Sequence, residues 1–302
     1  MQKQYFPLIY AWLILLVLSC QTDVNPSHQG SRYTFQHDGL EREYLFYAPE
    51  DLKANAPLVL VLHGFTSSAQ NIMDYSGYNQ LAEKHGFAVA YPQGSLDAES
   101  NTFWNVGYDF HADSTVDDIG FIGALVNFLQ QKYSLSRKNT FAVGMSNGAE
   151  LCYLLACERA ESFRAIATVA GTMMNNRFDN CQPSRPLPVL SIFGTQDKTT
   201  RYEGDEENQD GWGAYKSIPS IIDFWTANID YDQGATDTLP NLVREDSSFV
   251  IRETYINKDA GLEFLYYKVV GGGHDWPGAW GNEDINASVL TWSFFEQHLQ
   301  AY

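Results

Sequence analysis

The residues with the clearest chemical potential stand in a G-x-S-x-G run at residues 144–148. An apolar stretch, residues 141–143, precedes this run, and leucines at helical spacing follow it. A serine flanked in this way, between a strand and a helix, is typical of a nucleophile elbow. The tight turn leaves no room for a Cβ on either flank and holds the serine backbone under strain. We therefore expect Ser146 Oγ to project from the end of a sheet as a nucleophile.

A nucleophilic serine needs a general base, and the base needs an acid that orients it. In an α/β sheet these groups follow successive strands in the order serine, acid, histidine. Asp197 follows the apolar run 189–193, and His274 follows the run 262–270 and three glycines. We expect Asp197 and His274 to complete a triad with Ser146. The glycines would let the backbone approach the elbow closely.

Backbone amides are expected to stabilise the oxyanion that forms when the serine attacks a carbonyl group. Asn147, directly after the serine, offers one N–H group. Phe65 offers the second, because the sequence His63-Gly64-Phe65 ends the apolar run 58–62. In this interpretation the backbone around His63, and not its imidazole ring, serves the reaction.

Other acids and histidines fit these roles less well. Asp275 is too close in sequence to His274 to bridge to it easily, and the remaining histidines are interpreted as structural or solvated. Asp205 and Asp210 also compete as acids and lie in an acidic run, residues 203–211. The run lacks the spacing of a calcium-binding loop, so we interpret it as a solvated charged segment. We therefore expect no metal and no cofactor.

Composition limits the partners of this chain of 302 residues. Its formal net charge is −18, which argues against nucleic acid and anionic membrane surfaces because both would repel it. The 44% of hydrophobic residues suffice for a substantial core. We expect a small substrate that is neutral or uncharged.

Residues 1–20 are typical of a targeting segment. Within them, residues 8–18 form an apolar run that is short for a membrane span. The run leads to Cys20 and resembles a bacterial lipobox, in which that cysteine becomes lipidated. An ordinary secretory signal or a membrane anchor is the alternative. Residues 21–31 are polar and predict a flexible tether, so we expect an extracytoplasmic protein that contacts the membrane through lipid on Cys20.

Three further cysteines are available for a disulfide after export. Cys152 and Cys157 lie five residues apart on one predicted helix and point to different faces. Cys157 falls in the last helical turn, and Cys181 lies in a polar loop that can reach it. We therefore predict a Cys157–Cys181 disulfide, with Cys152 as a small buried hydrophobic residue.

Apolar runs alternate with amphipathic segments along the rest of the chain. Strands are predicted at residues 32–36, 41–47, 58–62, 87–91, 141–143, 163–169, 189–193, 249–256 and 262–270. Helices are predicted at residues 78–85, after a capping box at Thr115, after the elbow, after Ser217 and from Asp284. This alternation indicates a mostly parallel α/β sheet with helices on both faces, in one domain over residues 32–302.

The motifs together resemble the secreted polyhydroxybutyrate depolymerase and feruloyl esterase family of α/β hydrolases. The matching stretches are residues 62–65, 91–94, 116–121, 144–148, 155–158, 194–197, 272–278 and 284–288. The resemblance implies the α/β-hydrolase fold and serine ester hydrolysis, with the catalytic roles on Ser146, Asp197 and His274. Ala149 and Phe193 depart from the family, which often has glycine and histidine there.

The resemblance also bears on the substrate. Family members that attack solid polyester usually carry a separate binding domain, and this chain ends after its last predicted helix. We expect hydrolysis of feruloyl or acetyl esters on plant-polysaccharide fragments, with polyhydroxybutyrate oligomers as the alternative. Trp104, Tyr108 and Trp276 are candidates for an aromatic wall of the pocket. A serine peptidase would share the triad, and a non-catalytic surface-binding lipoprotein on this scaffold is the alternative from another class.

Overall fold

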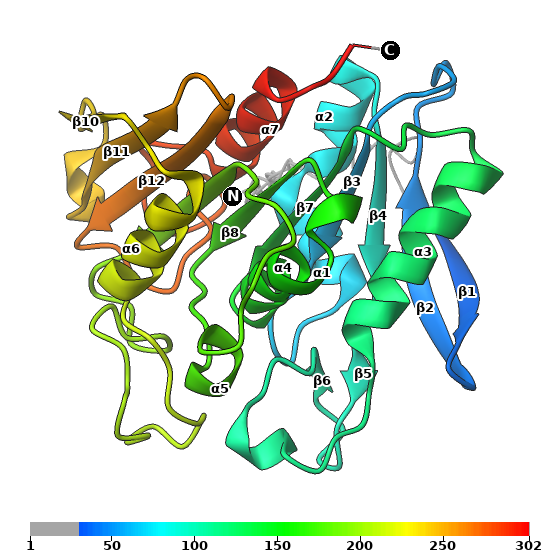
Figure 1. Cartoon of the computed structure of the whole chain (residues 1–302), viewed down its shortest axis with the longest axis horizontal. Helices are drawn as coiled ribbons and strands as arrows, with labels where there is room; N and C mark the ends of the chain where they lie inside the picture. The colour runs from blue at the N-terminus through cyan, green and yellow to red at the C-terminus, as the bar shows by residue number, and fades with distance from the viewer. Residues whose placement is uncertain (1–29, 302) are drawn as a thin grey trace, which may run out of the picture.

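The computed structural model describes residues 30–301 and is built around one ten-stranded sheet (Figure 1). Its spatial order is β1-β2-β4-β3-β7-β8-β9-β12-β11-β10. The strands are β1 (Ser31–His37), β2 (Leu40–Tyr47), β3 (Leu58–Leu62), β4 (Ala88–Pro92), β7 (Thr140–Met145), β8 (Ala165–Val169), β9 (Val189–Gly194), β10 (Gln233–Thr238), β11 (Phe249–Asn257) and β12 (Leu262–Val270). A separate two-stranded ribbon pairs β5 (Ser95–Leu96) with β6 (Thr102–Phe103).

The centre of the sheet is parallel and its edges are antiparallel. Neighbours from β4 through β3, β7, β8 and β9 to β12 all run parallel. The remaining pairs, β1 with β2, β2 with β4, β12 with β11 and β11 with β10, are antiparallel. Every residue of β3, β4, β7, β8 and β9 is buried, which explains their continuous apolar sequences. The predicted α/β-hydrolase fold is confirmed.

Helices cover both faces of this sheet (Figure 1). One face packs against α3 (Asp118–Lys132), α4 (Asn147–Glu158) and α6 (Ile218–Ile229). The other packs against α1 (Ala69–Ser76), α2 (Tyr78–His85) and α7 (Ala287–Gln297). A short helix, α5 (Asn175–Phe178), lies between β8 and β9 in the sequence. Each layer therefore has its own apolar core, separated by the sheet.

Some helix boundaries differ from the predictions. Helix α3 is capped by Asp117, whose Oδ1 accepts the N–H of Gly120 at 2.8 Å, and not by Thr115. Helix α7 is capped by Asn286, two residues after the predicted start. Helix α1 and strand β10 were not predicted; every residue of β10 is exposed, so its sequence carries no apolar pattern. Ser217 caps α6 as predicted.

The parallel register places the ends of successive strands at one edge of the sheet. In the β3–β7 pair, Leu62 lies opposite Gly144, so the loop after β3 adjoins the elbow. In the β9–β12 pair, Gly194 lies opposite Val269, so the loops that carry Asp197 and His274 are also neighbours. Functional loops of α/β folds gather at this carboxyl edge.

The structure contains the predicted Cys157–Cys181 disulfide, and Cys152 is free and buried. The expected targeting segment, Cys20 and nearly all of the expected tether lie outside the described residues. No helix within residues 30–301 is both long and apolar enough for a membrane span.

Candidate active site

Ser146 stands at the strained turn that its sequence predicts. Its backbone has φ 54° and ψ −123°, in the left-handed half of conformational space that a non-glycine residue rarely adopts. A Cβ on Gly144 would lie 2.2 Å from Gly148 O, and a Cβ on Gly148 would lie 2.2 Å from Leu62 O. Both flanks therefore need glycine, and α4 begins immediately after the serine.

Asp197 and His274 are joined as predicted. Nδ1 of His274 lies 2.7 Å from Oδ2 of Asp197, whose side chain is fully buried. The other carboxylate oxygen of Asp197 accepts the N–H groups of Thr199 and Thr200, each at 2.8 Å. These bonds fix the carboxylate, and the carboxylate fixes the imidazole ring. Within residues 30–301 no hydrogen bond joins His274 to Ser146 Oγ.

The loop before His274 makes a different contact from the one expected for its glycines. A Cβ on Gly194, at the end of β9, would lie 2.4 Å from the carbonyl oxygens of both Gly272 and Gly273. The loop therefore packs closely against the end of β9 and not against the elbow. This packing still sets the distance between the Asp197 and His274 loops.

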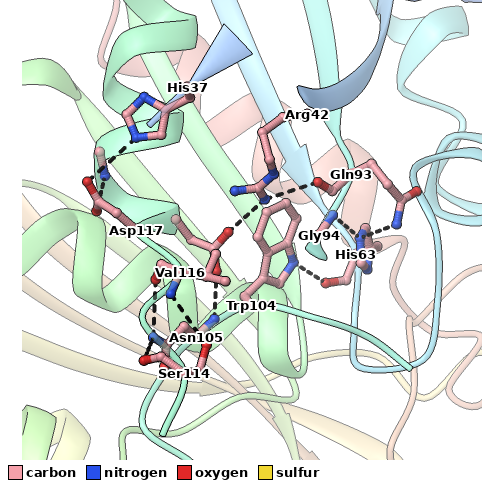
Figure 2. Close-up of polar contacts among 12 residues, drawn as sticks. His37, Arg42, His63, Gln93, Gly94, Trp104, Asn105, Ser114, Val116 and Asp117 are labelled. Atoms are coloured by element: carbon pink, nitrogen blue, oxygen red, sulfur yellow. Dashed lines mark hydrogen bonds and ion pairs between the residues drawn. The ribbon is translucent and has the colours of Figure 1, made fainter. Parts of the chain in front are cut away.

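The loop after β3 lies beside the serine. A Cβ on Gly64 would lie 3.3 Å from the Ser146 Cβ. The imidazole of His63 contacts this loop, because its Nδ1 lies 2.7 Å from Gly64 O. Its Nε2 accepts the N–H of Gly94 at 2.9 Å (Figure 2). Nδ1 is therefore the protonated nitrogen, and it donates to the Gly64 carbonyl.

The ring of His63 therefore has a structural role, although the sequence analysis assigned a role only to the backbone around this residue. In a trans peptide unit the C=O of Gly64 and the N–H of Phe65 point in opposite directions. By holding the carbonyl, His63 orients the Phe65 N–H group. Burial lowers the pKa of His63 to about 4, so the ring stays neutral at ordinary pH.

Side chains behind the elbow connect these loops. Asn147 is fully buried, and its amide pairs with the backbone of Trp104 through both Oδ1 (2.7 Å) and Nδ2 (3.1 Å). The indole N–H of Trp104 donates to His63 O at 2.8 Å (Figure 2). The side chain of Asn147 is therefore structural, and its backbone N–H remains the group expected to face an oxyanion.

A buried ion pair supports the same region. Nη2 of Arg42 lies 2.7 Å from Oδ1 of Asp118, and the other oxygen of Asp118 accepts the N–H of Asn105. Arg42 also donates to the carbonyl of Gln93. Burial raises the pKa of Asp118, and the charge of Arg42 opposes this effect. The pair anchors the loop that carries Trp104 and the turn before Gly94.

A narrow cavity of about 20 Å³ opens beside Ser146. Its walls include Tyr108, Glu150, Thr172, Thr200, Trp212 and Tyr215. Trp104 and Trp276 are 0% and 1% exposed and do not line this cavity, so for them the structure differs from the expected aromatic wall. Their indole N–H groups bond to His63 O and Ser288 Oγ inside the core.

Glu150 is the carboxylic acid among the cavity-lining residues, and the sequence analysis did not name it. It lies in the first turn of α4, is 5% exposed, and accepts a 2.6 Å hydrogen bond from Tyr108 Oη. Burial raises its pKa to about 7, opposed by contacts with Tyr108 and Asn147 and by the charge of His274. A glutamate at a helical position normally faces solvent, so the sequence carried no signal of this burial.

The acidic run 203–211 lies near the same cavity. Asp205 is buried and accepts the N–H groups of Gln209 and Asp210, so this residue is not solvated as expected. The side chain of Asn208 bonds to Asp109 at 2.8 Å, and the following Trp212 reaches the cavity wall. Among residues 30–301, no cluster of three His, Cys, Asp or Glu is placed to hold a metal ion.

The sheet, the elbow and the loop order define the α/β-hydrolase class. The acetyl xylan esterase from Aspergillus awamori superposes with a TM-score of 0.58 at 18% identity, over 81% of this chain and 94% of that structure. At this identity the likeness supports the fold alone.

The family follows from the sequence comparisons. The family model described as Esterase PHB depolymerase matches residues 42–181. NocK of Nocardia uniformis subsp. tsuyamanensis, a protein assigned as an esterase, is 30% identical over 80% of this chain and 72% of its own length. This chain therefore belongs to the Esterase PHB depolymerase family and is a carboxylic ester hydrolase.

Other relatives differ in the substrates that their names state. The bifunctional acetylxylan esterase/xylanase XynS20E of Neocallimastix patriciarum is 23% identical over 85% of this chain, which spans only 34% of that protein. Further relatives carry the names feruloyl esterase and poly(3-hydroxyalkanoate) depolymerase.

Proposed function

We propose that this chain hydrolyses esters through a serine mechanism in which Ser146 is the nucleophile, His274 the base and Asp197 the orienting acid. The observation that carries the proposal is the 2.7 Å bond between His274 and Asp197, on loops that end at the same sheet edge as the elbow. The contact between His274 and Ser146 Oγ is part of the proposal and forms when substrate binds.

In this mechanism Ser146 Oγ attacks the ester carbonyl while His274 Nε2 takes its proton. The N–H groups of Phe65 and Asn147 stabilise the oxyanion, and His274 then gives the proton to the leaving alcohol. Water, activated by the same histidine, releases the acid from the acyl-enzyme. Asp197 holds the imidazole in the tautomer that leaves Nε2 free to accept, and it stabilises the imidazolium.

For substrate, we propose feruloyl or acetyl esters on plant-polysaccharide fragments. The support is the names of the relatives and the net charge of −18, which favours neutral sugar chains over anionic partners. The test is a panel of 4-nitrophenyl acetate and butyrate, methyl ferulate, acetylated xylan fragments and a hydroxybutyrate oligomer. We expect turnover of the acetylated or feruloylated members above that of the oligomer.

Hydroxybutyrate oligomers are the second candidate, favoured by the family description and by the depolymerase relative. If the enzyme clears a polyhydroxybutyrate suspension but does not hydrolyse methyl ferulate or acetylated xylan, hydroxybutyrate oligomers become the preferred substrate class. The non-catalytic alternative predicts no turnover of any member of the panel.

We further propose that residues 1–20 are a signal segment with lipid on Cys20, residues 21–31 a tether, and residues 32–302 the catalytic domain. The support is the short apolar run before Cys20. A Cys20→Ser variant should be released from the membrane. An unmodified mature N-terminus elsewhere in the intact-mass spectrum would refute the anchor.

A further inference from the structure

Glu150 is a buried carboxyl group that the proposed triad mechanism does not use. It lies one helical turn after Ser146 on α4, and its side chain is held by the Tyr108 hydroxyl at 2.6 Å. Burying a carboxyl group costs free energy that its hydrogen bond with Tyr108 only partly offsets, so the fold keeps a destabilising group beside its nucleophile. The cost of burying this carboxyl group indicates a function in the cavity that Glu150 and Ser146 both line.

The size of the cavity restricts what can enter it. Its volume of about 20 Å³ gives room for about one group of the size of water, which is also about the size of a methyl group. Glu150 and Tyr108 line one part of its wall, while Trp212 and Tyr215 belong to the segment that follows the acidic run. The methyl of an acetyl group fits this space and a phenylpropenoid group does not, so of the two ester classes proposed above the cavity selects the acetyl esters.

The acyl part of the ester, and not the alcohol, suits this cavity. His274 gives its proton to the leaving alcohol, and its side chain is 22% exposed. A sugar chain attached to that alcohol therefore has access to solvent on the histidine side. The cavity beside Ser146, which Glu150 and Tyr108 line, remains for the acyl group.

We propose that Glu150, held by Tyr108, forms the closed end of the acyl pocket and restricts the enzyme to acyl groups of about acetyl size. The proposal rests on the proposed function and makes Glu150 a specificity-determining residue. Longer acyl chains are excluded in two ways. Their methylenes collide with the carboxyl group, and they would strip it of polar contacts without replacing them.

The test compares kcat/KM for 4-nitrophenyl acetate and butyrate in the wild type and four variants. Glu150→Ala opens the end of the pocket. The double variant Glu150→Ala/Tyr108→Phe opens it without leaving the tyrosine hydroxyl unpaired, which keeps the test valid if the single variant fails to fold. Glu150→Gln keeps the size and still accepts from Tyr108. Glu158→Ala, an exposed glutamate at the other end of α4, is the matched control.

The wild type should prefer acetate by at least about tenfold, since a single misplaced methylene has effects of this order. The opened variants should raise the butyrate-to-acetate ratio about tenfold or more, while Glu150→Gln and Glu158→Ala keep the wild-type ratio. Equal wild-type rates on both esters, or an unchanged ratio in the double variant, would overturn the proposal. Failure of the serine mechanism would show separately, as turnover that persists in Ser146→Ala.

Discussion

Nδ1 of His274 lies 2.7 Å from Oδ2 of Asp197, although 77 residues separate them in the sequence. The contact exists because β9 and β12 are parallel neighbours and each residue follows its strand at the same edge. Two backbone N–H groups hold the other oxygen of Asp197, so the carboxylate has one orientation available for the imidazole.

Asp197→Asn should reduce kcat for 4-nitrophenyl acetate by about 10⁴-fold, the loss found when a triad aspartate is replaced by asparagine. The asparagine oxygen can still accept from Thr199 and Thr200, so its NH₂ group faces His274 and favours the wrong tautomer. Steady-state kinetics measure the loss, and circular dichroism checks the fold. A loss below about tenfold would exclude Asp197 as the orienting acid.

His63→Gln should lower kcat by about ten- to a hundredfold with little change in KM, because a poorly oriented donor loses part of its oxyanion stabilisation. The ring of His63 acts through the Gly64 carbonyl and the Phe65 N–H, so it is a positioning residue. Active sites are titrated first, so that the rate refers to folded enzyme. His85→Gln, a histidine at the end of α2 that pairs with Glu296, is the control and should keep the wild-type kcat. A change in KM alone would contradict the proposed role of His63.

Glu150→Gln should change how stability depends on pH. The folded-state pKa of Glu150 is about 7 and the reference value is 4.5, so between these values the folded state keeps a proton that the unfolded state has lost. Stability of the wild type therefore falls as pH rises through this window, by up to about 3 kcal/mol. Urea unfolding should show that the free energy of unfolding of the variant, relative to that of the wild type, is higher at pH 8 than at pH 5. An equal difference at both pH values would contradict this prediction.

The Cys157–Cys181 disulfide should contribute about 3 kcal/mol to stability, since it closes a loop between residues 24 apart in the sequence. A Cys157→Ser/Cys181→Ser variant should unfold at correspondingly lower urea concentration. Reductant should lower the wild type to the same midpoint and leave the variant unchanged. A peptide map of unreduced protein that links Cys152 to Cys181 would show a different pairing.

Much of this fold was predictable because its central strands are buried on both faces. The sequence Leu58–Leu62 is apolar throughout, and a short apolar run of this kind is typical of a strand that is buried on both faces. Strand β10, Gln233–Thr238, carries no apolar pattern, since it lies exposed at the sheet edge and forms by pairing with β11. Its pairing depends on a partner that local sequence does not specify.

The residues of the candidate site also differ in whether the local sequence predicts their roles. Ser146, Asp197 and His274 could be proposed from the sequence because each follows a strand in a recognisable local sequence. The roles of the His63 ring and of Glu150 depend on contacts with Gly94 and Tyr108, which tertiary packing alone brings together. Trp104 and Trp276 were misjudged for a related reason, because aromatic residues in loops can close the core as well as line a pocket.

The most direct test of the account is the turnover of 4-nitrophenyl acetate by Ser146→Ala. The serine lies at a strained turn, and its removal should leave the fold intact, as circular dichroism and an unchanged Cys157–Cys181 disulfide will show. We predict that kcat falls by more than a thousandfold, because the nucleophile of a triad acts as a unit with its base. Turnover above about a thousandth of the wild-type rate would contradict the serine mechanism.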